Sequence, residues 1–172
     1  MEFEVSMRLY IVRHGIAIDR EDPKCPPEAE RYLTEKGIAK TEVVARAFAR
    51  LGVEADLLLS SPYVRAMQTA EIFAAALTYP KQKIAKTETL LPGAEPLAFY
   101  RELARHKEAE CVACFGHAPN VDQLVAAAIG AKKETTEMKK AGVAALELRR
   151  ISPPSGTLVW LGTPKLLRAS LE

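Results

Sequence analysis

Two histidines and two arginines of this chain have the chemistry to bind and transfer a phosphoryl group. They are His14, His117, Arg13 and Arg65. An imidazole can attack phosphorus as well as carry protons, and a guanidinium group matches the oxygens of a phosphate. If these four side chains meet in space, they form a cationic pocket in which one imidazole can act as a nucleophile.

Each of the four follows a short apolar run that predicts a buried strand. Arg13 and His14 come directly after the apolar residues 9–12, and Gly15 then lets the backbone turn sharply. Similar runs at 57–59 and 111–115 precede Arg65 and His117. Ligands of open α/β sheets bind at the carboxyl ends of the strands, so we expect the four residues to converge there if the strands are parallel neighbours.

Helix starts follow two of these strands. Ser61 and Pro62 predict a helix with serine as N-cap and proline at the first helical position, which places Arg65 in or just after the first turn. Pro119 marks a second helix start, before an apolar face between 121 and 129. The free N–H groups and the dipole of a helix N-terminus attract anions, which agrees with a phosphoryl site.

The remaining segments predict an α/β fold. Helices are expected from Thr34 to about Leu51, from Pro62 to about Leu77 and from Pro96, with a short strand within 83–91. Alternation of strands and helices through Ile129 implies a mainly parallel sheet covered on both faces. Two last strand-like runs, 143–148 and 158–161, flank a turn at 152–156 and predict an antiparallel hairpin at the edge of the sheet.

Length and charge set bounds on organisation and partners. The 172 residues, 48% of them hydrophobic, predict one domain (1–172), with residues 1–6 as an extension of the first strand or a disordered end. The 24 basic and 22 acidic residues give a net charge of +2, which argues against nucleic acid or membrane as a partner. No apolar run reaches transmembrane length, and acidic residues stand near the start where a signal peptide is basic, so we expect a cytoplasmic protein.

Four blocks of the chain, in order, resemble the signature motifs of the histidine phosphatase superfamily, also called phosphoglycerate mutase-like. The match at 33–37 is typical of the short SixA-like phosphohistidine phosphatases within it. The resemblance covers roughly residues 7–150 and implies a three-layer α/β/α sandwich with a mainly parallel central sheet. The blocks are Arg13-His14-Gly15, Leu33-Thr34-Glu35-Lys36-Gly37, Ser60-Ser61-Pro62-Tyr63-Val64-Arg65-Ala66-Met67-Gln68-Thr69-Ala70-Glu71 and Gly116-His117-Ala118-Pro119-Asn120.

The resemblance also assigns roles. It implies that His14 is the nucleophile, that a phosphohistidine intermediate forms on it and that water then hydrolyses this intermediate, with no cofactor and no metal. Arg13, Arg65 and His117 would hold the phosphoryl oxygens. To attack phosphorus the His14 imidazole must be neutral, which nearby arginines favour, and we expect a backbone carbonyl to fix its tautomer.

Two further roles are open between alternatives. We expect Glu88 to be the proton donor to the leaving group, because the family that this chain resembles often carries a glutamate near this position. Asp19 and Glu95 are the alternatives. Asn120 either touches the phosphate or caps its helix, as asparagine often does.

The expected substrate is a phosphorylated protein, in particular protein phosphohistidine. Only about fifty residues separate Arg65 from His117, which leaves little length for a covering insertion and predicts a shallow, open site. The proline-containing segment 16–31 is read as a loop or broken helix beside the first strand. The alternatives are a phosphatase of small phosphate esters, a phosphomutase with the same nucleophile, and a phosphate-binding module without catalysis.

Other chemistry fits the residues less well. Cys111, Cys114 and His117, with Cys25 as a fourth ligand, have spacings found in zinc sites. Residues three apart on a strand point to opposite faces, however, so neither a shared metal nor a disulfide is expected. Ser60 and Ser61 lack the surrounding glycines of a nucleophilic serine elbow.

Overall fold

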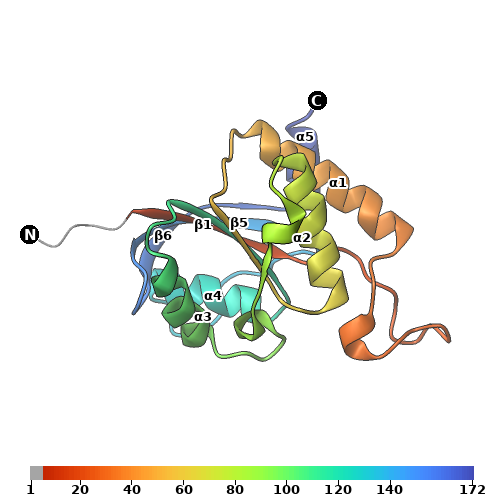
Figure 1. Ribbon diagram of the computed structural model, residues 1–172, viewed down its shortest axis with the longest axis horizontal. Coiled ribbons are helices and arrows are strands. Elements are labelled where there is room, and N and C mark those ends of the chain that lie inside the picture. Colours follow the sequence, from red (N-terminus) through yellow and green to blue (C-terminus); the bar gives the residue numbers. More distant parts are fainter. Residues whose placement is uncertain (1–5) are drawn as a thin grey trace, which may run out of the picture.

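The structure, a computed structural model, describes residues 6–172, which form one six-stranded mixed sheet between two layers of helices (Figure 1). The strands lie in the order β3-β2-β4-β1-β5-β6. Their bounds are β1 Met7–Arg13, β2 Leu57–Ser60, β3 Ala85–Lys86, β4 Cys111–Gly116, β5 Val143–Arg150 and β6 Ser155–Gly162. The first four are parallel to one another, and β5 and β6 run antiparallel at the far edge. This confirms the predicted α/β/α fold with its edge hairpin.

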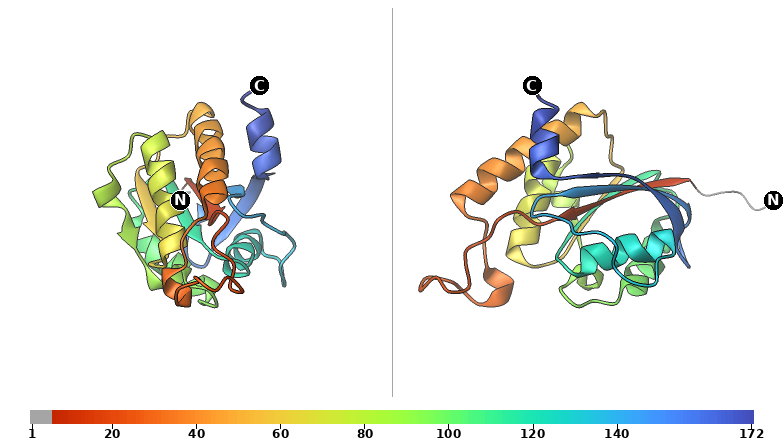
Figure 2. Two further views of the ribbon diagram at one scale, coloured as in Figure 1. Left: turned by 90° about the vertical axis from the view of Figure 1, so that its right-hand side faces the viewer. Right: turned by 180° about the vertical axis from the view of Figure 1, so that it is seen from behind.

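Helices cover both faces of the sheet. The helices α1 (Glu35–Arg50), α2 (Val64–Ala76) and α5 (Pro164–Ala169) lie on one face, and α3 (Pro96–Leu103) and α4 (Asn120–Ile129) lie on the other (Figures 1 and 2). Short 3-10 turns add η1 (Glu28–Glu30), η2 (Lys81–Lys83), η3 (Glu88–Leu90) and η4 (Ala104–His106).

The central strand β1 is buried on both sides, as its unbroken apolar sequence predicts. Leu9 and Ile11 belong to the core cluster under α3 and α4, whereas Tyr10 and Val12 belong to the cluster under α1 and α2. All four are less than one-tenth exposed. Because alternate residues of a strand face opposite sides, one short segment joins both halves of the core.

The start of α1 is fixed by its sequence. The Thr34 side chain accepts a hydrogen bond from the Gly37 amide at 3.0 Å, which confirms the predicted N-cap. A Cβ atom on Gly37 would lie 2.0 Å from the Ile16 carbonyl oxygen, so only glycine permits this approach of the helix to the chain that follows β1.

Two predicted boundaries are wrong. The helix after β2 begins at Val64, and its N-cap position is Tyr63 rather than Ser61, because the Ser61 hydroxyl serves other groups, as described below. The turn between β5 and β6 is also shorter than predicted, since β5 extends to Arg150 and β6 begins at Ser155. The strand β1 begins at Met7. Of the predicted extension 1–6, residues 1–5 lie outside the described residues.

Strand register places the predicted residues at one edge of the sheet. Arg13 lies opposite Gly116 in the parallel pair of β1 and β4, and Ser60 lies opposite Phe115 in the pair of β2 and β4. The carboxyl ends of β1, β2 and β4 therefore lie side by side. The segments that carry His14, Arg65 and His117 follow these strands at the same edge of the sheet.

Candidate active site

The structure places His14 next to both Arg65 and His117. The ring centroids of the two histidines are 5.1 Å apart, and Nε of Arg65 lies 3.4 Å from Nε2 of His14. These three side chains and that of Arg13, the residue before His14, are called the candidate site below. Its members come from three different strand ends, as the sequence predicts.

The tautomer of His14 is set by its own neighbour. Nδ1 of His14 lies 2.7 Å from the carbonyl oxygen of Gly15. A carbonyl oxygen can only accept a hydrogen bond, so Nδ1 carries the proton and Nε2 keeps its lone pair. This confirms the expected role of a backbone carbonyl. Backbone hydrogen bonds from His14 N to Gly116 O and from Gly15 N to Thr69 Oγ1 fix the turn that holds the ring.

Both histidines of the candidate site are neutral at physiological pH. Burial lowers the pKa of His14 to about 3, and the positive charges of Arg65 and Arg13 act in the same direction. Burial also lowers the pKa of His117 to about 3, again with support from neighbouring cationic groups. A neutral imidazole with a bare Nε2 is the form that can attack phosphorus.

Arg65 is held by a residue that the sequence did not single out. Its Nη2 lies 2.9 Å from Oε1 of Glu28, and its Nη1 donates a 2.8 Å hydrogen bond to the carbonyl oxygen of Glu28. The Arg65 side chain is only 2% exposed, and the Tyr63 ring covers it with a centroid 5.2 Å from Cζ. Glu28 therefore fixes the plane of the guanidinium that faces His14.

Glu28 is shared by three arginines. Its carboxylate contacts Arg20 at 2.9 Å and Arg31 at 3.2 Å in addition to Arg65. These hydrogen bonds and charges, with that from Arg20 the largest, lower the pKa of Glu28 to about 2. The carboxyl group is thus ionised at neutral pH and holds no proton that it could give to a leaving group.

Three side chains of the candidate site are buried. His14 is 8% exposed, and Arg65 and His117 are 2% exposed. Glu28 of the segment 16–31 lies against Arg65. A shallow, open substrate site stays a prediction.

Arg13 and His117 each present a buried polar atom that has no hydrogen-bond partner among residues 6–172. Nη1 of Arg13 donates to the carbonyl oxygen of Met138 at 2.8 Å, but Nε of Arg13 has no acceptor. Nε2 of His117 and the Ser61 hydroxyl form a 2.8 Å hydrogen bond, and Nδ1 of His117 is left without one. Buried polar atoms are nearly always paired, so unpaired ones at the same strand ends mark a place for a ligand.

The side chain of Asn120 does not cap its helix. Its Nδ2 donates a 2.8 Å hydrogen bond to the carbonyl oxygen of Ala94, and no side-chain cap forms at the start of α4. The capping alternative is therefore wrong. The amide donor is also engaged away from the candidate site, while Oδ1 is buried without a partner. A role of Asn120 in phosphate contact stays a prediction.

The three predicted proton donors are exposed side chains. Glu88 lies in η3, beside the strand ends, where the preceding Thr87 amide donates to the carbonyl oxygen of Ser60. Glu95 pairs with Arg101 at 2.9 Å, and Asp19 accepts a hydrogen bond from the Glu21 amide. The structure brings none of the three into hydrogen-bond contact with the candidate site.

The cysteines lie as the strand geometry predicts. Cys114 is in the core under α3 and α4, whereas Cys111 packs against the cluster on the opposite face. Within residues 6–172, no group of three or more His, Cys, Asp and Glu side chains could hold a metal ion. Over the same residues, no helix combines the length and the apolar character needed to cross a membrane.

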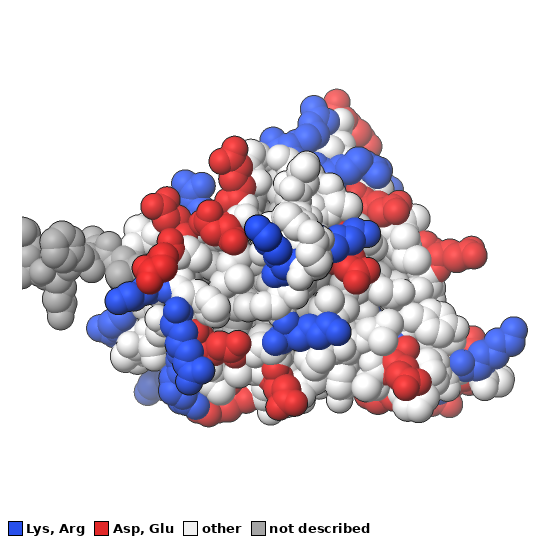
Figure 3. Space-filling model, in the orientation of Figure 1, with Lys and Arg blue, Asp and Glu red and all other residues white. Residues whose placement is uncertain are grey.

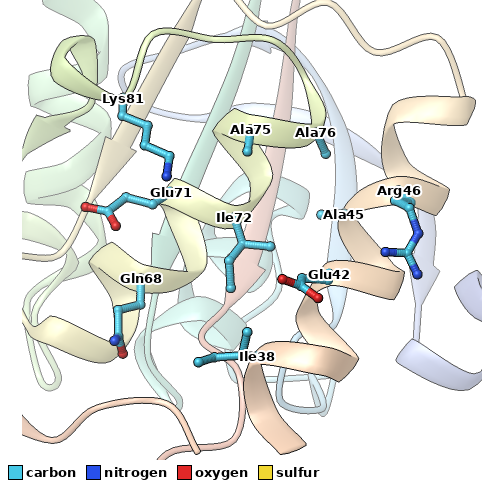
Figure 4. A pocket seen from close by; sticks show the side chains of 10 residues that line it. All are labelled: Ile38, Glu42, Ala45, Arg46, Gln68, Glu71, Ile72, Ala75, Ala76 and Lys81. Carbon is cyan, nitrogen blue, oxygen red and sulfur yellow. The ribbon is translucent and has the colours of Figure 1, made fainter. Parts of the chain in front are cut away.

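A separate groove between α1 and α2 contains none of the candidate-site residues (Figure 4). It has a volume of about 430 Å³, and Ile38, Ile72 and Ala75 provide much of its apolar lining. Glu71 and Lys81 stand at its edge. Apolar walls with charges of both signs do not suit a phosphoryl group, so this groove is not a second candidate for the same chemistry.

Comparison with known proteins agrees with the fold. The family described as histidine phosphatase superfamily (branch 1) matches residues 9–90. An uncharacterized protein of Picosynechococcus sp. is 37% identical over 143 residues, which are 81% of this chain and 84% of that protein. The structure of the protein histidine phosphatase SixA complexed with tungstate has a TM-score of 0.82 and 25% identity, over 92% of this chain and 98% of SixA.

A more distant relative is much longer. The mitochondrial serine/threonine-protein phosphatase Pgam5 of Drosophila ananassae is 29% identical over 113 residues, and the match covers 58% of this chain and 38% of Pgam5. Together with the fold and the candidate site, these matches show that the chain belongs to the histidine phosphatase superfamily.

Proposed function

We propose that this protein is a phosphatase that hydrolyses phosphohistidine in a protein substrate through a phosphohistidine intermediate on His14. The observation that carries the proposal is the neutral His14 ring, whose bare Nε2 faces the Arg65 guanidinium at 3.4 Å. The unpartnered Nε of Arg13 and Nδ1 of His117 support it, because a phosphoryl oxygen would satisfy both atoms.

The first chemical step is attack by Nε2 of His14 on phosphorus. The new N–P bond forms as the bond from phosphorus to the substrate nitrogen or oxygen breaks, and the leaving group keeps that electron pair. Arg65 and Arg13 balance the charge on the phosphoryl oxygens. If the Ser61 hydroxyl donates to Nε2 of His117, the other nitrogen of that ring carries a proton and donates it in a hydrogen bond to a third oxygen.

The second step releases phosphate. A water molecule attacks phosphorus, the bond to Nε2 breaks, and inorganic phosphate leaves with His14 restored. When the leaving group of the first step is an imidazole, its own basicity lets it take a proton from water. For ester substrates we propose Glu88 as the donor, since its turn lies beside the strand ends, with Asp19 and Glu95 as alternatives. Glu28 is unsuited to this role because its carboxylate is paired with three arginines.

The choice of protein phosphohistidine rests on two observations. The chain is similar over nearly its whole fold to a protein histidine phosphatase. The chain between Arg65 and His117 is occupied by the rest of α2, the short elements up to η4 and the strand β4, so it contributes no separate covering domain. A phosphatase of small phosphate esters, a mutase, or a binding module without turnover would use the same four residues and are the alternatives.

The test is transfer of a labelled phosphoryl group to the enzyme. Wild-type protein is incubated with a ³²P-labelled phosphohistidine protein and a chelator, quenched in base, and examined for acid-labile label. We expect label on the wild type and none on His14→Asn, whereas the matched variant His106→Asn, altered at a histidine in η4, labels normally. Release of inorganic phosphate from the phosphohistidine protein should follow the same pattern.

The other outcomes favour the alternatives. Label that appears only with small phosphate esters would indicate a metabolite phosphatase, and label passed on to an acceptor hydroxyl would indicate a mutase. Absence of label and of phosphate release with every donor would leave a binding module.

A further inference from the structure

A basic hollow lies directly behind the turn that carries His14. It has a volume of about 560 Å³ and lies between β1, α1, the segment before β5 and the start of α5. A second hollow of about 330 Å³ shares Lys40, Pro164 and Lys165 with the first and continues between α1 and α5 to Arg168. Figure 2 shows α5 beside α1. The two hollows are called the α1–α5 groove below. Its basic lining residues are Arg13, Lys40, Lys139, Lys140, Lys165 and Arg168.

The groove shares its inner wall with the candidate site. The Ala141 amide donates to the carbonyl oxygens of Arg13 and His14 at 3.0 and 3.1 Å, so the segment 139–141 rests on the catalytic turn. Thr41, which also lines the groove, is so close to Gly15 that a Cβ atom there would lie 2.4 Å from its hydroxyl oxygen. A molecule that occupies the groove is therefore anchored next to His14.

The charge of the groove is not balanced within the protein. Glu137 is its one acidic lining residue, and it pairs with Lys139 at 2.6 Å. Among the described residues, Lys40, Lys140, Lys165 and Arg168 are exposed and form no ion pair with a carboxylate. By contrast, positive and negative side chains are interspersed over the face in Figure 3. Because the net charge of the chain is only +2, this local concentration of lysines gives the groove a positive potential that would attract an acidic partner.

We propose that the α1–α5 groove binds an acidic surface of the phosphorylated protein substrate and thereby orients the phosphorylated side chain toward His14. This inference rests on the proposed function. A macromolecular surface fits the groove better than a small polyanion, because the lysines are exposed and spread over two helices and a loop. A small anion would require convergent, buried donors, such as those of the candidate site.

The experiment compares substrates that differ only in what surrounds the phosphoryl group. One substrate is a protein with acidic residues around its phosphohistidine, the second is the same protein with those residues changed to lysine, and the third is phosphoramidate. The enzyme variant is Lys40→Glu/Lys165→Glu. The matched control is Lys107→Glu. Lys107 is exposed and lies between η4 and the start of β4. It is therefore at the opposite end of β4 from His117.

For the double variant we expect kcat/KM on the acidic protein to fall at least about tenfold, mainly through KM, because electrostatic attraction raises association rates by about tenfold or more. Activity on phosphoramidate should stay unchanged, and activity on the lysine-bearing protein should rise. Salt should reduce the wild-type rate on the acidic protein more strongly than that of the variant.

Three results would overturn the inference: equal rates of wild type and variant on the acidic protein, an equal loss on phosphoramidate, or an equal loss in Lys107→Glu. The proposed function fails separately, if the wild type turns over phosphoramidate or esters but neither phosphohistidine protein. In that case this inference falls with it.

Discussion

The carboxylate of Glu28 lies 2.9 Å from Nη2 of Arg65, and the carbonyl oxygen of the same residue accepts from Nη1 of Arg65 at 2.8 Å. One residue thus holds two nitrogens of a guanidinium whose third nitrogen, Nε, points at Nε2 of His14, the proposed nucleophile. The segment 16–31 is thereby joined to the candidate site, although none of the four candidate-site residues belongs to it. Glu28 acts as a positioning residue for Arg65.

Replacement of Glu28 by alanine should separate catalysis from anion binding. Without the carboxylate, Arg65 keeps only its bond to a backbone carbonyl and loses its fixed plane, so we expect kcat to fall about tenfold, as for loss of a positioning group. Removal of a negative charge near the pocket should at the same time leave the affinity for inorganic phosphate equal or higher. Steady-state kinetics and product inhibition by phosphate measure the two effects.

Arg20→Ala is the control for this prediction. Arg20 contacts the same carboxylate, but its side chain is 69% exposed and no hydrogen bond joins it to Arg65. We expect its kcat to match that of the wild type. An unchanged kcat in Glu28→Ala, or loss of phosphate affinity together with kcat, would show that Glu28 does not act through Arg65.

Oxyanions should stabilise the folded protein through the unpaired nitrogens of Arg13 and His117. At a concentration one hundred times the dissociation constant, a bound anion adds about 2.7 kcal/mol to the free energy of unfolding. Arg13→Lys should lose most of this gain, since lysine has no counterpart of Nε. Thermal unfolding with and without tungstate or phosphate measures the difference, and an equal shift of Tm in both proteins would contradict the prediction.

Acid should destabilise the fold, beginning just below pH 6.5, because His14 and His117 are buried and neutral. Their pKa values are about 3 in the folded protein, against about 6.5 in an unfolded chain. Between these values the unfolded state binds more protons, so stability is full above pH 6.5 and falls as the pH falls toward 3. Each histidine contributes a slope of up to about 1.4 kcal/mol per pH unit.

Urea unfolding of the wild type and of His117→Gln at a series of pH values tests this dependence. The variant has one such histidine fewer, so its stability should fall less steeply between pH 6 and pH 4. Parallel curves for the two proteins would mean that His117 is not held in its neutral form. The acid limb of the labelling reaction on His14 should likewise lie far below pH 6.5.

The sequence predicts the four candidate-site residues because each follows an apolar strand, and strands of a parallel sheet end at one edge. His14 and His117 could be placed close together without knowledge of any side-chain contact. The start of α2 was misplaced because Ser61 matches the pattern of an N-cap. In the structure its hydroxyl bonds to His117 and accepts from the Tyr63 amide, and the helix begins after it.

Glu28 could not be predicted in the same way. The segment 16–31 contains several carboxylates among prolines and basic residues, and no periodicity distinguishes one of them. Its contact with Arg65 spans 37 positions of the chain and depends on the path of a loop, which local sequence does not determine.

Gly37 offers a test of how the fold supports this loop. Alanine there would place Cβ 2.0 Å from the Ile16 carbonyl oxygen, a backbone atom that cannot rotate away, so either α1 or the chain after His14 must move. We expect a loss of about 2–3 kcal/mol in the free energy of unfolding, typical of overpacking, together with a fall in kcat.

Gly52→Ala is the comparison, since Gly52 has a φ of +75° and open space around it. It should cost about 1–2 kcal/mol from backbone strain alone and leave kcat unchanged. Urea unfolding of the two variants measures the free energy of unfolding, and steady-state kinetics measure kcat. A Gly37→Ala enzyme with the kcat of the wild type would show that the position of Ile16 has no influence on the turn that holds His14.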